Sequence, residues 1–434
     1  MKRSHIFGGV VAIVSLLAAS CSTPADEEAS PAEAATNFCS TATTDQTPLL
    51  SPTETADAFD TSGGVQTGNG TAEVDNTSDH FSKLDSRVAQ APNWSTDWSR
   101  ATIDTSEIFS GGPPKDGIPP IDTPKFETTT QACDWLAANE PGAVVEIDGE
   151  ARFYPLGILT KHEIVNDRFG DTPVAVTFCP LCNTAISFDR RVDNEVRRFG
   201  VSGFLRKSDM VMWDDKTDSL WQQVTGEAIV GDAAGTELEK IGTAISSFDQ
   251  FAKNFPEGLS LSKETGLRGS YGTNPYDGYS SRDTPIPQFF DGEIDSRLPG
   301  LERVVGVEID GQHKAYPFST LPIGSVVNDT IEEQPVVVWR EGTTADALDK
   351  GTIAESESIG TAVAFAAVVD GQELTFTSNS DGTFTDEQTE STWNVLGKAT
   401  DGELVGEQLE LLIHSNEFWF AWSAFFPDGE LYQA

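Results

Sequence analysis

The sequence predicts an α+β fold that is mainly β, built as two tandem copies of one β-rich module behind a disordered N-terminal tether. Three observations lead to this prediction. A set of short motifs recurs once along the chain, strand-like segments alternate with tight turns, and the N-terminal region lacks hydrophobic periodicity. Strands joined by short turns, with few long helical periods, are typical of a mainly β or α+β architecture.

The composition excludes some classes of function. The 434 residues include 69 Asp and Glu against 28 Lys and Arg, which gives a formal net charge of −41. At about 100–200 residues per domain, this length allows two to four domains with real hydrophobic cores. Such an acidic chain repels nucleic-acid phosphates and anionic lipid headgroups, so we expect no nucleic-acid partner and membrane contact through an N-terminal anchor only.

Residues 1–20 are predicted to form a lipoprotein signal peptide. Lys2 and Arg3 precede an apolar stretch, residues 6–17, that is shorter than the roughly twenty residues of a membrane-spanning helix. Small residues then lead to Cys21, as in a lipobox, although Ala18 stands where leucine is usual. We therefore expect lipidation of Cys21 and an extracytoplasmic, lipid-anchored protein; the alternative is plain secretory cleavage near Ala18.

Residues 21–100 are predicted to be a disordered acidic tether. Ala, Ser, Thr, Asp, Glu and Gly dominate this stretch, and its apolar residues are isolated. Cys39 lies within it. A proline-rich segment, residues 111–124, then leads into the folded part of the chain.

The internal repeat defines the remaining organisation: module 1 at residues 101–265, a connector at 266–300 and module 2 at 301–434. The recurring segments are Val145–Gly149 with Val307–Gly311, Tyr154–Pro155 with Tyr316–Pro317, Val165–Asp167 with Val327–Asp329, Pro173–Val174 with Pro335–Val336, Trp221 with Trp393, Val230–Gly231 with Val405–Gly406, and Phe255–Gly258 with Phe426–Gly429. One repetition indicates two copies of a module and not a solenoid.

Each copy begins with a predicted β-hairpin whose turn is Asp-Gly. In module 1 we expect a short helix from Leu156 to Val165, then a strand from Val174 to Phe178. Further elements are expected at Ala185–Phe188 and Val211–Trp213, which resemble strands, and at Phe248–Asn254, which resembles a helix. The connector is predicted to be ordered if Tyr271, Tyr276 and Tyr279 pack back on a module.

The main candidate site is the Cys179-Pro180-Leu181-Cys182 segment that follows the Val174 strand. A Cys-X-X-Cys turn can acidify one thiol and make it a nucleophile for disulfide exchange. The residues after it alternate like a strand, so this redox interpretation does not imply a thioredoxin fold. In this scheme Cys179 or Cys182 attacks a disulfide or peroxide, the other thiol resolves it, and His162 or a backbone N–H stabilises the thiolate.

Two other interpretations of the pair stay open. The segment resembles one knuckle of a zinc ribbon, but the second Cys-X-X-Cys that a ribbon supplies is absent. His162 and Cys133 are the nearest candidates to complete the four ligands of a zinc site, whereas copper or another thiophilic ion could accept fewer ligands. The third interpretation is a structural disulfide or two buried thiols. At the repeat offset Cys179 becomes Glu341, so the module does not need the pair for its fold. We favour redox first, metal second and a structural role third.

Other residues are weaker candidates for the functional site. Asp209 and Arg206 could line the cysteine pocket, although solvated charge is the expected role. Trp213 and Trp221 are expected in the core. Ser202 and Ser208 lack a triad pattern, and no phosphate-binding loop appears. With Cys21 acylated, Cys39 and Cys133 could form a disulfide in an oxidising exterior.

Several separated motifs stand in a fixed order: Phe178–Ala185, Phe199–Gly203, Ser208–Met210, Ser219–Trp221, Gly226–Gly231 and Phe418–Trp422. Together they resemble the domain of unknown function 3179 family of exported bacterial and archaeal proteins, over roughly residues 117–432. The resemblance implies no established reaction. Some relatives are described as selenoproteins at the cysteine motif, which implies redox chemistry if it carries over to Cys179 or Cys182.

The sequence therefore predicts an exported lipoprotein with a thiol–disulfide redox site, whose partner is an unidentified protein or small-molecule thiol or disulfide. The alternatives are an extracytoplasmic metal-binding or carrier protein that uses the same thiols for zinc or copper, and a non-catalytic binding module that uses the connector tyrosines.

Overall fold

The computed structural model describes residues 37–41, 74–75, 83–267 and 271–434. The predicted signal peptide, Cys21 and most of the predicted tether lie outside these residues. Within them the chain is mainly β with a few short helices, as expected. None of the helices in the described part is long and apolar enough to cross a membrane.

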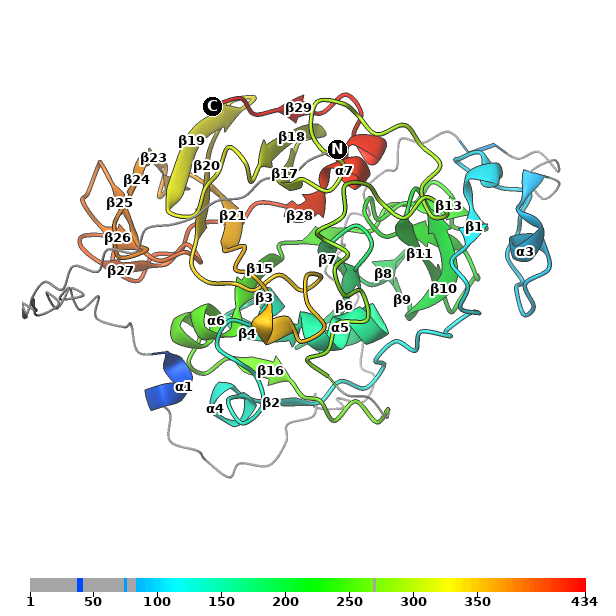
Figure 1. Cartoon of the computed structure of the whole chain (residues 1–434), viewed down its shortest axis with the longest axis horizontal. Coiled ribbons are helices and arrows are strands. Elements are labelled where there is room, and N and C mark those ends of the chain that lie inside the picture. Colours follow the sequence, from blue (N-terminus) through cyan, green and yellow to red (C-terminus); the bar gives the residue numbers. More distant parts are fainter. Residues whose placement is uncertain (1–36, 42–73, 76–82, 268–270) are drawn as a thin grey trace, which may run out of the picture. The chain divides into compact units, whose positions relative to one another are not determined.

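The first half contains three main sheets, shown in cyan and green in Figure 1. The first has the order β15-β3-β4-β16-β2, the second β14-β7-β6-β5 and the third β1-β10-β11-β12-β13. The strands are β1 (Phe109–Ser110), β2 (Phe126–Thr128), β3 (Pro141–Ile147), β4 (Glu150–Pro155), β5 (Ile164–Phe169), β6 (Thr172–Cys179), β7 (Thr184–Asp189), β10 (Phe199–Arg206), β11 (Asp209–Asp214), β12 (Leu220–Gln222), β13 (Ala228–Val230), β14 (Lys240–Ile241), β15 (Ala244–Ser247) and β16 (Leu259–Leu261), with a small hairpin of β8 (Arg191–Val192) and β9 (Glu195–Val196).

The second half contains sheets with the orders β28-β17-β18-β29, β19-β20-β21 and β24-β25-β26-β27. Its strands are β17 (Arg303–Ile309), β18 (Gln312–Pro317), β19 (Ser325–Ile331), β20 (Gln334–Glu341), β21 (Thr361–Ala366), β24 (Phe376–Ser378), β25 (Phe384–Asp386), β26 (Thr392–Trp393), β27 (Ala399–Asp401), β28 (His414–Phe418) and β29 (Glu430–Leu431), with a small hairpin of β22 (Val368–Val369) and β23 (Gln372–Glu373).

The helices are short. They are α1 (Phe38–Thr41), α3 (Ser86–Ala89), α4 (Thr129–Ala132), α5 (Leu156–His162), α6 (Phe248–Asn254) and α7 (Trp419–Phe425), with 3₁₀ turns at Thr105–Glu107 and Ile353–Glu355. The α6 helix matches its prediction and begins with a capping box in which Ser247 and Gln250 bond each other's backbone. The α5 helix ends earlier than predicted, because Glu163 adopts a left-handed conformation that stops it.

The two halves arrange their strands in the same order. In the sheets that contain the predicted hairpins, β15 and β28 pair antiparallel with β3 and β17, whereas β16 and β29 pair parallel with β4 and β18. The Asp-Gly turns form as predicted, with positive φ at Asp148, Gly149, Asp310 and Gly311.

The recurring residues serve the fold. The Tyr154 and Tyr316 hydroxyls donate to Asp167 and Asp329, one in each half. Likewise the Trp221 and Trp393 indoles each donate to an aspartate, Asp214 or Asp386, at 2.9 Å. Because both members of each pair make the same internal contact, these tyrosines and tryptophans stabilise the sheets of both halves.

One predicted correspondence is misplaced. Gly402, not Gly406, stands where Gly231 stands in the first half: both have positive φ, and a Cβ on either would clash with Ser219 or Ser391. The strand registers agree, since Trp221 lies opposite Ala228 and Trp393 opposite Ala399. Sequence matching selected the Val-Gly pair that lies four residues further along the chain.

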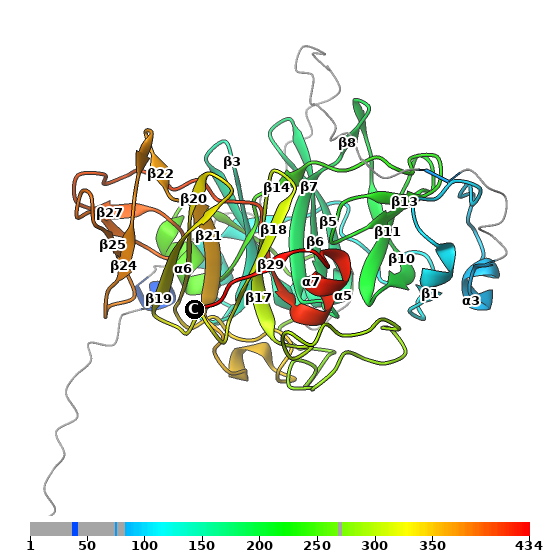
Figure 2. The same ribbon diagram turned by 90° about the horizontal axis from the view of Figure 1, so that it is seen from above.

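Both halves share one hydrophobic core. Its largest cluster of buried residues includes Phe178 and Cys182 from the first half together with Phe418 and Trp422 from the second. The β28 strand of the second half packs against β7 of the first half, and β15 of the first half packs against β21 of the second. Each half therefore contributes a strand that contacts a sheet of the other half. Figures 1 and 2 show the β24–β27 and β10–β13 sheets on opposite sides of this shared centre. Residues 37–434 accordingly form one compact unit.

Part of the predicted tether is folded. Leu84 and Val88 are buried against Phe204 and Val211 of the first half, so the ordered chain already includes residues 83–100. Cys39 and Cys133 form a disulfide across 94 residues of sequence, which attaches α1 to the folded part. Removing such a bridge would free a long loop and increase the entropy of the unfolded chain.

Candidate functional site

The cysteine pair lies at the buried end of a strand in which only the first residue, Thr172, is partly exposed. The β6 strand supplies Cys179 as its last residue, and a four-residue turn that contains Cys182 leads into β7. Asn183 closes this turn in a left-handed conformation, with φ of 58°. The side chains of Cys179 and Cys182 are 2% and 0% exposed, and both thiols are free.

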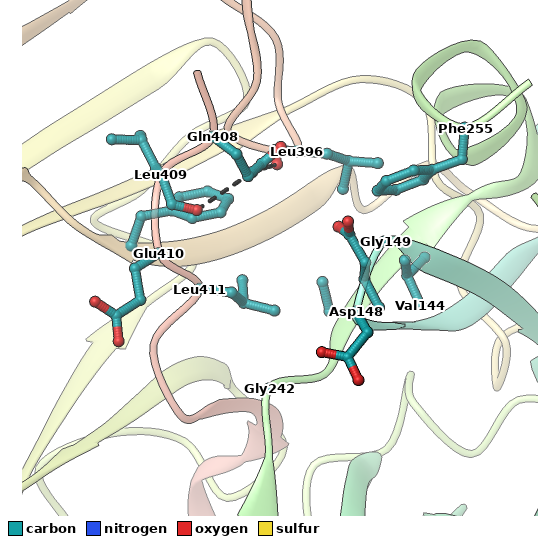
Figure 3. A pocket seen from close by; sticks show the side chains of 13 residues that line it. Val144, Asp148, Gly149, Gly242, Phe255, Leu396, Gln408, Leu409, Glu410 and Leu411 are labelled. Atoms are coloured by element: carbon teal, nitrogen blue, oxygen red, sulfur yellow. Dashed lines mark hydrogen bonds between the residues drawn. The ribbon is translucent and has the colours of Figure 1, made fainter. Parts of the chain in front are cut away.

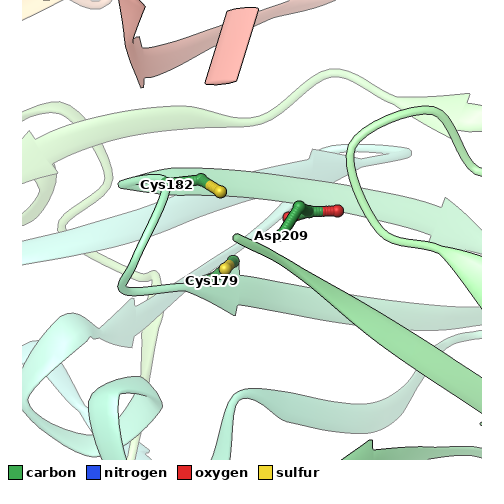
Figure 4. A group of neighbouring side chains, drawn as sticks. All are labelled: Cys179, Cys182 and Asp209. Carbon is green, nitrogen blue, oxygen red and sulfur yellow. The ribbon is translucent and has the colours of Figure 1, made fainter. Parts of the chain in front are cut away.

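A third acidic group joins the two thiols. Asp209 is the first residue of β11, and its carboxylate oxygen and the two Sγ atoms all lie within 4.8 Å of one another (Figure 4). The prediction of a solvated role for Asp209 is wrong, since its side chain is fully buried. Oδ2 accepts hydrogen bonds from the Gln222 amide at 2.6 Å and the Val224 backbone at 3.1 Å. Oδ1 accepts none from the described residues and is buried.

The turn that places Asp209 beside the thiols consists of two non-glycine residues with positive φ. Lys207 and Ser208 connect β10 and β11 with φ values of 52° and 67°, although neither is glycine or asparagine. The Ser208 carbonyl faces the Cys179 thiol at 3.8 Å. Together with Glu163 and Asn183, this makes four non-glycine residues with positive φ around the pair. Such conformations cost energy and concentrate at functional sites.

The second half and the connector cover the cysteine turn. The Phe418 backbone N–H donates to the Cys182 carbonyl at 3.0 Å, and the Asn183 amide donates to the Asn416 carbonyl at 2.9 Å. From the connector, the Tyr279 hydroxyl donates to the Leu181 carbonyl at 2.9 Å. Tyr279 thus packs back on the first half, which is the condition under which the sequence predicted an ordered connector, and the site lies at the junction of both halves.

Two more carboxyl groups are buried near the thiols. Glu163 ends α5 and is 7% exposed, and Glu417 of β28 is fully buried. Ser415 donates to Oε1 of Glu417, whereas Oε2 is buried without a partner. Among the described residues no ion pair includes Asp209, Glu163 or Glu417. The site therefore concentrates acidic groups without a neutralising side chain.

Burial governs the ionisation of these groups. It raises the pKa of Asp209 to about 6 and the pKa values of Glu163 and Glu417 to about 8, because the charged forms lose their hydration. Burial and the neighbouring carboxylates also raise the pKa of both thiols. In the absence of a cation, the thiol forms of Cys179 and Cys182 are favoured over thiolates.

His162 does not join the thiols. Its Nδ1 lies 2.7 Å from the Pro119 carbonyl and its Nε2 lies 2.8 Å from the Tyr271 hydroxyl, so both ring nitrogens are engaged elsewhere. The potential metal-ligand atom that lies within 4.8 Å of the two Sγ atoms belongs to Asp209, not to His162. Cys133, the other suggested ligand, is in the disulfide, and Arg206 pairs with Glu107.

The equivalent place in the second half is built differently. Glu341 ends β20 as Cys179 ends β6, and its carbonyl accepts from the Gln250 amide. The Thr344 and Thr361 hydroxyls both donate to the same Gln250 side chain. A long loop replaces the four-residue turn between the strands. Amide and hydroxyl groups thus surround the end of β20, and within the described chain the group of two thiols and a carboxylate occurs at the end of β6.

The sequence indicated the thiols, named Asp209 only as a residue that could line their pocket, and gave no sign of Glu163 or Glu417. Asp209 lies within the Ser208–Met210 motif that carried the family resemblance, and this was the available signal for it. Glu163 and Glu417 lie in β-rich segments with no local pattern that distinguishes them from surface residues. Glu163 lies near the thiols because its carbonyl accepts a hydrogen bond from the Phe178 backbone N–H at 2.8 Å, beside the paired strands β5 and β6. Glu417 lies there because β28 packs against β7.

The molecule is therefore a mainly β protein with a buried dithiol–carboxylate site. Residues 115–429 match the model of the family described as Protein of unknown function (DUF3179), and the chain belongs to this family. The resemblance inferred from the ordered set of motifs is thereby confirmed. No curated protein and no solved structure matches the chain.

Proposed function

We propose that this chain is an exported, lipid-anchored protein that binds a thiophilic metal ion through Cys179, Cys182 and Asp209. The observation that carries the proposal is the convergence of two free thiols and a carboxylate within 4.8 Å, with Oδ1 of Asp209 buried and unpaired. An unpaired buried acceptor costs free energy, and a bound cation would remove that cost.

The donor atoms suit zinc or copper. Thiolate sulfur favours soft or borderline ions, and a site with three protein ligands leaves a position for water or substrate. The ion would supply Lewis acidity or, for copper, electron transfer. Glu163 and Glu417 would add negative charge around the ligands, and Gln222 would orient Asp209 through its hydrogen bond.

A thiol–disulfide redox function is the second candidate. It is favoured by the proximity of two free thiols in one Cys-X-X-Cys turn. In this reaction the two thiols would form one disulfide while a partner disulfide is reduced to two thiols, with two electrons and two protons transferred. The burial of both sulfur atoms and their raised pKa values oppose it, because exchange requires an accessible thiolate.

Two organisational proposals accompany the metal site. The matching strand orders and matching Tyr–Asp and Trp–Asp contacts support the interpretation that the halves arose as copies of one module. The Cys39–Cys133 disulfide supports an oxidising, extracytoplasmic location. Lipidation of Cys21 stays a proposal that rests on the sequence alone.

The decisive experiment measures the metal content and thiol state of purified protein loaded with Zn²⁺ or Cu⁺ and then freed of excess metal. We expect one equivalent of tightly bound metal, and elemental analysis should show its loss in Cys179→Ser and Cys182→Ser. Asp209→Asn should weaken the affinity by about 10–100-fold or more. The Cys39→Ser/Cys133→Ser variant is the matched control, since it removes two sulfur atoms outside the site and should retain the metal.

A different result would contradict the metal proposal. If the wild type binds no stoichiometric metal but shows a reversible two-electron couple that Cys182→Ser abolishes, the redox function is correct. If both cysteine variants retain the metal, the ion binds elsewhere and the dithiol site has no role in holding it.

A further inference from the structure

A second site lies away from the thiols, in a cavity between the two halves. Its volume is about 400 Å³, within the range of small-molecule pockets. The β3–β4 hairpin forms one wall, and the second-half segment that precedes β28 forms the opposite wall (Figure 3). Apolar side chains line much of it, among them Val144, Ala244, Phe255, Phe365, Leu409 and Leu411.

The polar lining of this cavity is acidic. Glu146, Asp148 and Glu410 belong to its lining, although the Glu410 carboxylate points away from the cavity (Figure 3), and no lining residue is basic. None of these three side chains makes a hydrogen bond or an ion pair with a described residue. Lys398 lies near enough to influence Glu146 electrostatically but forms no ion pair with it. The cavity therefore combines apolar surface with unneutralised negative charge.

The second half shows what occupies the corresponding place at its own hairpin. Glu308 of β17 corresponds to Glu146 of β3, since they lie opposite His313 and Ala151 in equivalent hairpin registers. There the Lys240 ammonium contacts both carboxylate oxygens of Glu308, at 2.6 and 2.8 Å. The same ammonium lies 5.9 Å from the ring of Phe426.

The cavity at the first hairpin exists because the corresponding side chains are smaller or uncharged. Lys240 lies opposite Phe188 of β7, and Leu411 lies opposite Phe365 of β21 in the equivalent arrangement. His313 stacks on Phe426 with ring centroids 4.2 Å apart, whereas Ala151 has no ring to place there. Phe255 follows α6 as Phe426 follows α7. The first hairpin therefore retains the aromatic ring but lacks counterparts of Lys240 and His313.

We propose that this cavity binds a primary alkylammonium ion. The ammonium would pair with Glu146 as Lys240 pairs with Glu308, and the alkyl chain would lie on Phe255 and Leu411. An alkyl chain gains free energy from burial of its methylene groups, and an ammonium is attracted both by carboxylates and by an aromatic face. The proposal is independent of the thiol site.

Calorimetric titration of the full-length protein with n-hexylammonium chloride tests the proposal. About 0.15 M NaCl screens non-specific attraction to the acidic chain. We expect saturable binding of one equivalent, with 1-hexanol and hexanoate weaker by at least about tenfold. Glu146→Gln should raise the Kd by at least about tenfold, which corresponds to about 1.4 kcal/mol. Leu411→Lys should abolish binding, because its own ammonium would occupy the site.

Glu403→Gln is the matched control: it removes the same charge from an exposed residue that does not line the cavity, and its Kd should equal that of the wild type. Glu146 is itself partly exposed, so its substitution leaves the fold intact even if Leu411→Lys does not fold. Three results would each overturn the proposal: no saturable binding by the wild type, equal binding by Glu146→Gln and the wild type, or equal affinity for hexanoate and hexylammonium.

Discussion

At the scale of single residues, His414 illustrates how burial sets a charge state. Its ring is buried in β28; Nδ1 lies 2.9 Å from the Leu412 carbonyl, and Nε2 has no partner among the described residues. Burial lowers its pKa from 6.5 to about 4, because a desolvated imidazolium lacks a compensating anion. The folded protein therefore holds His414 neutral over most of the physiological range.

This gives a prediction for acid stability. The folded pKa lies below the unfolded one, so the stabilising contribution is present above about pH 6.5 and is lost as the pH falls towards 4. A shift from 6.5 to about 4 corresponds to about 3 kcal/mol of the free energy of unfolding. Urea unfolding at pH 7 and pH 4.5 should show that His414→Asn, which can retain the bond to Leu412, loses less stability than the wild type.

His313→Asn is the comparison variant, since this ring is partly exposed and stacks on Phe426. It should follow the wild-type pH dependence more closely than His414→Asn does. If His414→Asn loses as much stability on acidification as the wild type, protonation of another group causes the loss of unfolding free energy at low pH.

At the scale of elements, the hairpin turns show where sequence reasoning succeeds. The Asp148-Gly149 turn was predicted because its residues tolerate positive φ, and the two strands beside it alternate in the expected register. The Lys207–Ser208 turn adopts positive φ as well, but its residues give no such signal. Tertiary packing imposes that turn, and for this reason its role in placing Asp209 could not be predicted from local sequence.

Ser208→Gly tests the energetic cost of this turn. Glycine adopts φ of 67° without strain, and the substitution also removes a buried hydroxyl that has no partner. We expect the free energy of unfolding to rise by about 1 kcal/mol, after the added flexibility of the unfolded chain is included. Denaturant unfolding of the metal-free protein measures this change, and metal content should stay at the wild-type value because the Ser208 carbonyl is retained.

Ser187→Gly is the control for Ser208→Gly. Its hydroxyl is also buried and unpaired, but Ser187 lies in β7, where glycine is unfavourable. It should be neutral or destabilising. A loss of stability in Ser208→Gly comparable to that in Ser187→Gly would show that the positive φ of Ser208 does not destabilise the folded protein.

At the scale of the whole molecule, the repeat predicted two modules but not their mutual packing. Matching motifs such as Tyr154–Pro155 and Tyr316–Pro317 are local in sequence, so they were visible. The contacts that build the thiol site join residues far apart in the chain, such as Cys182 and Phe418, and no local pattern encodes them. The thiols were thus predictable as a site, whereas Glu417 and the connector contacts depend on the shared core.

That shared core predicts cooperative unfolding of both halves. Phe418 is fully buried, its ring packs edge-on against Tyr279 at 5.9 Å, and its backbone bonds the first-half cysteine turn. Phe418→Ala should lower the free energy of unfolding by about 3–5 kcal/mol. Because β28 packs against β7, the loss should appear equally in the slowest-exchanging amides of β6 and β20, measured by native-state hydrogen exchange with mass spectrometry.

Val405→Ser provides the control, since Val405 is 60% exposed and its substitution should leave exchange in both strands unchanged. Independent modules would respond differently: Phe418→Ala would lower protection in β20 while β6 kept its wild-type value. Equal losses would mean that the acidic thiol site is held by the stability of the entire unit, because opening either half would expose Cys179, Cys182 and Asp209 to water together. A metal bound there should then raise protection in both strands by the same amount, since it binds only the folded state.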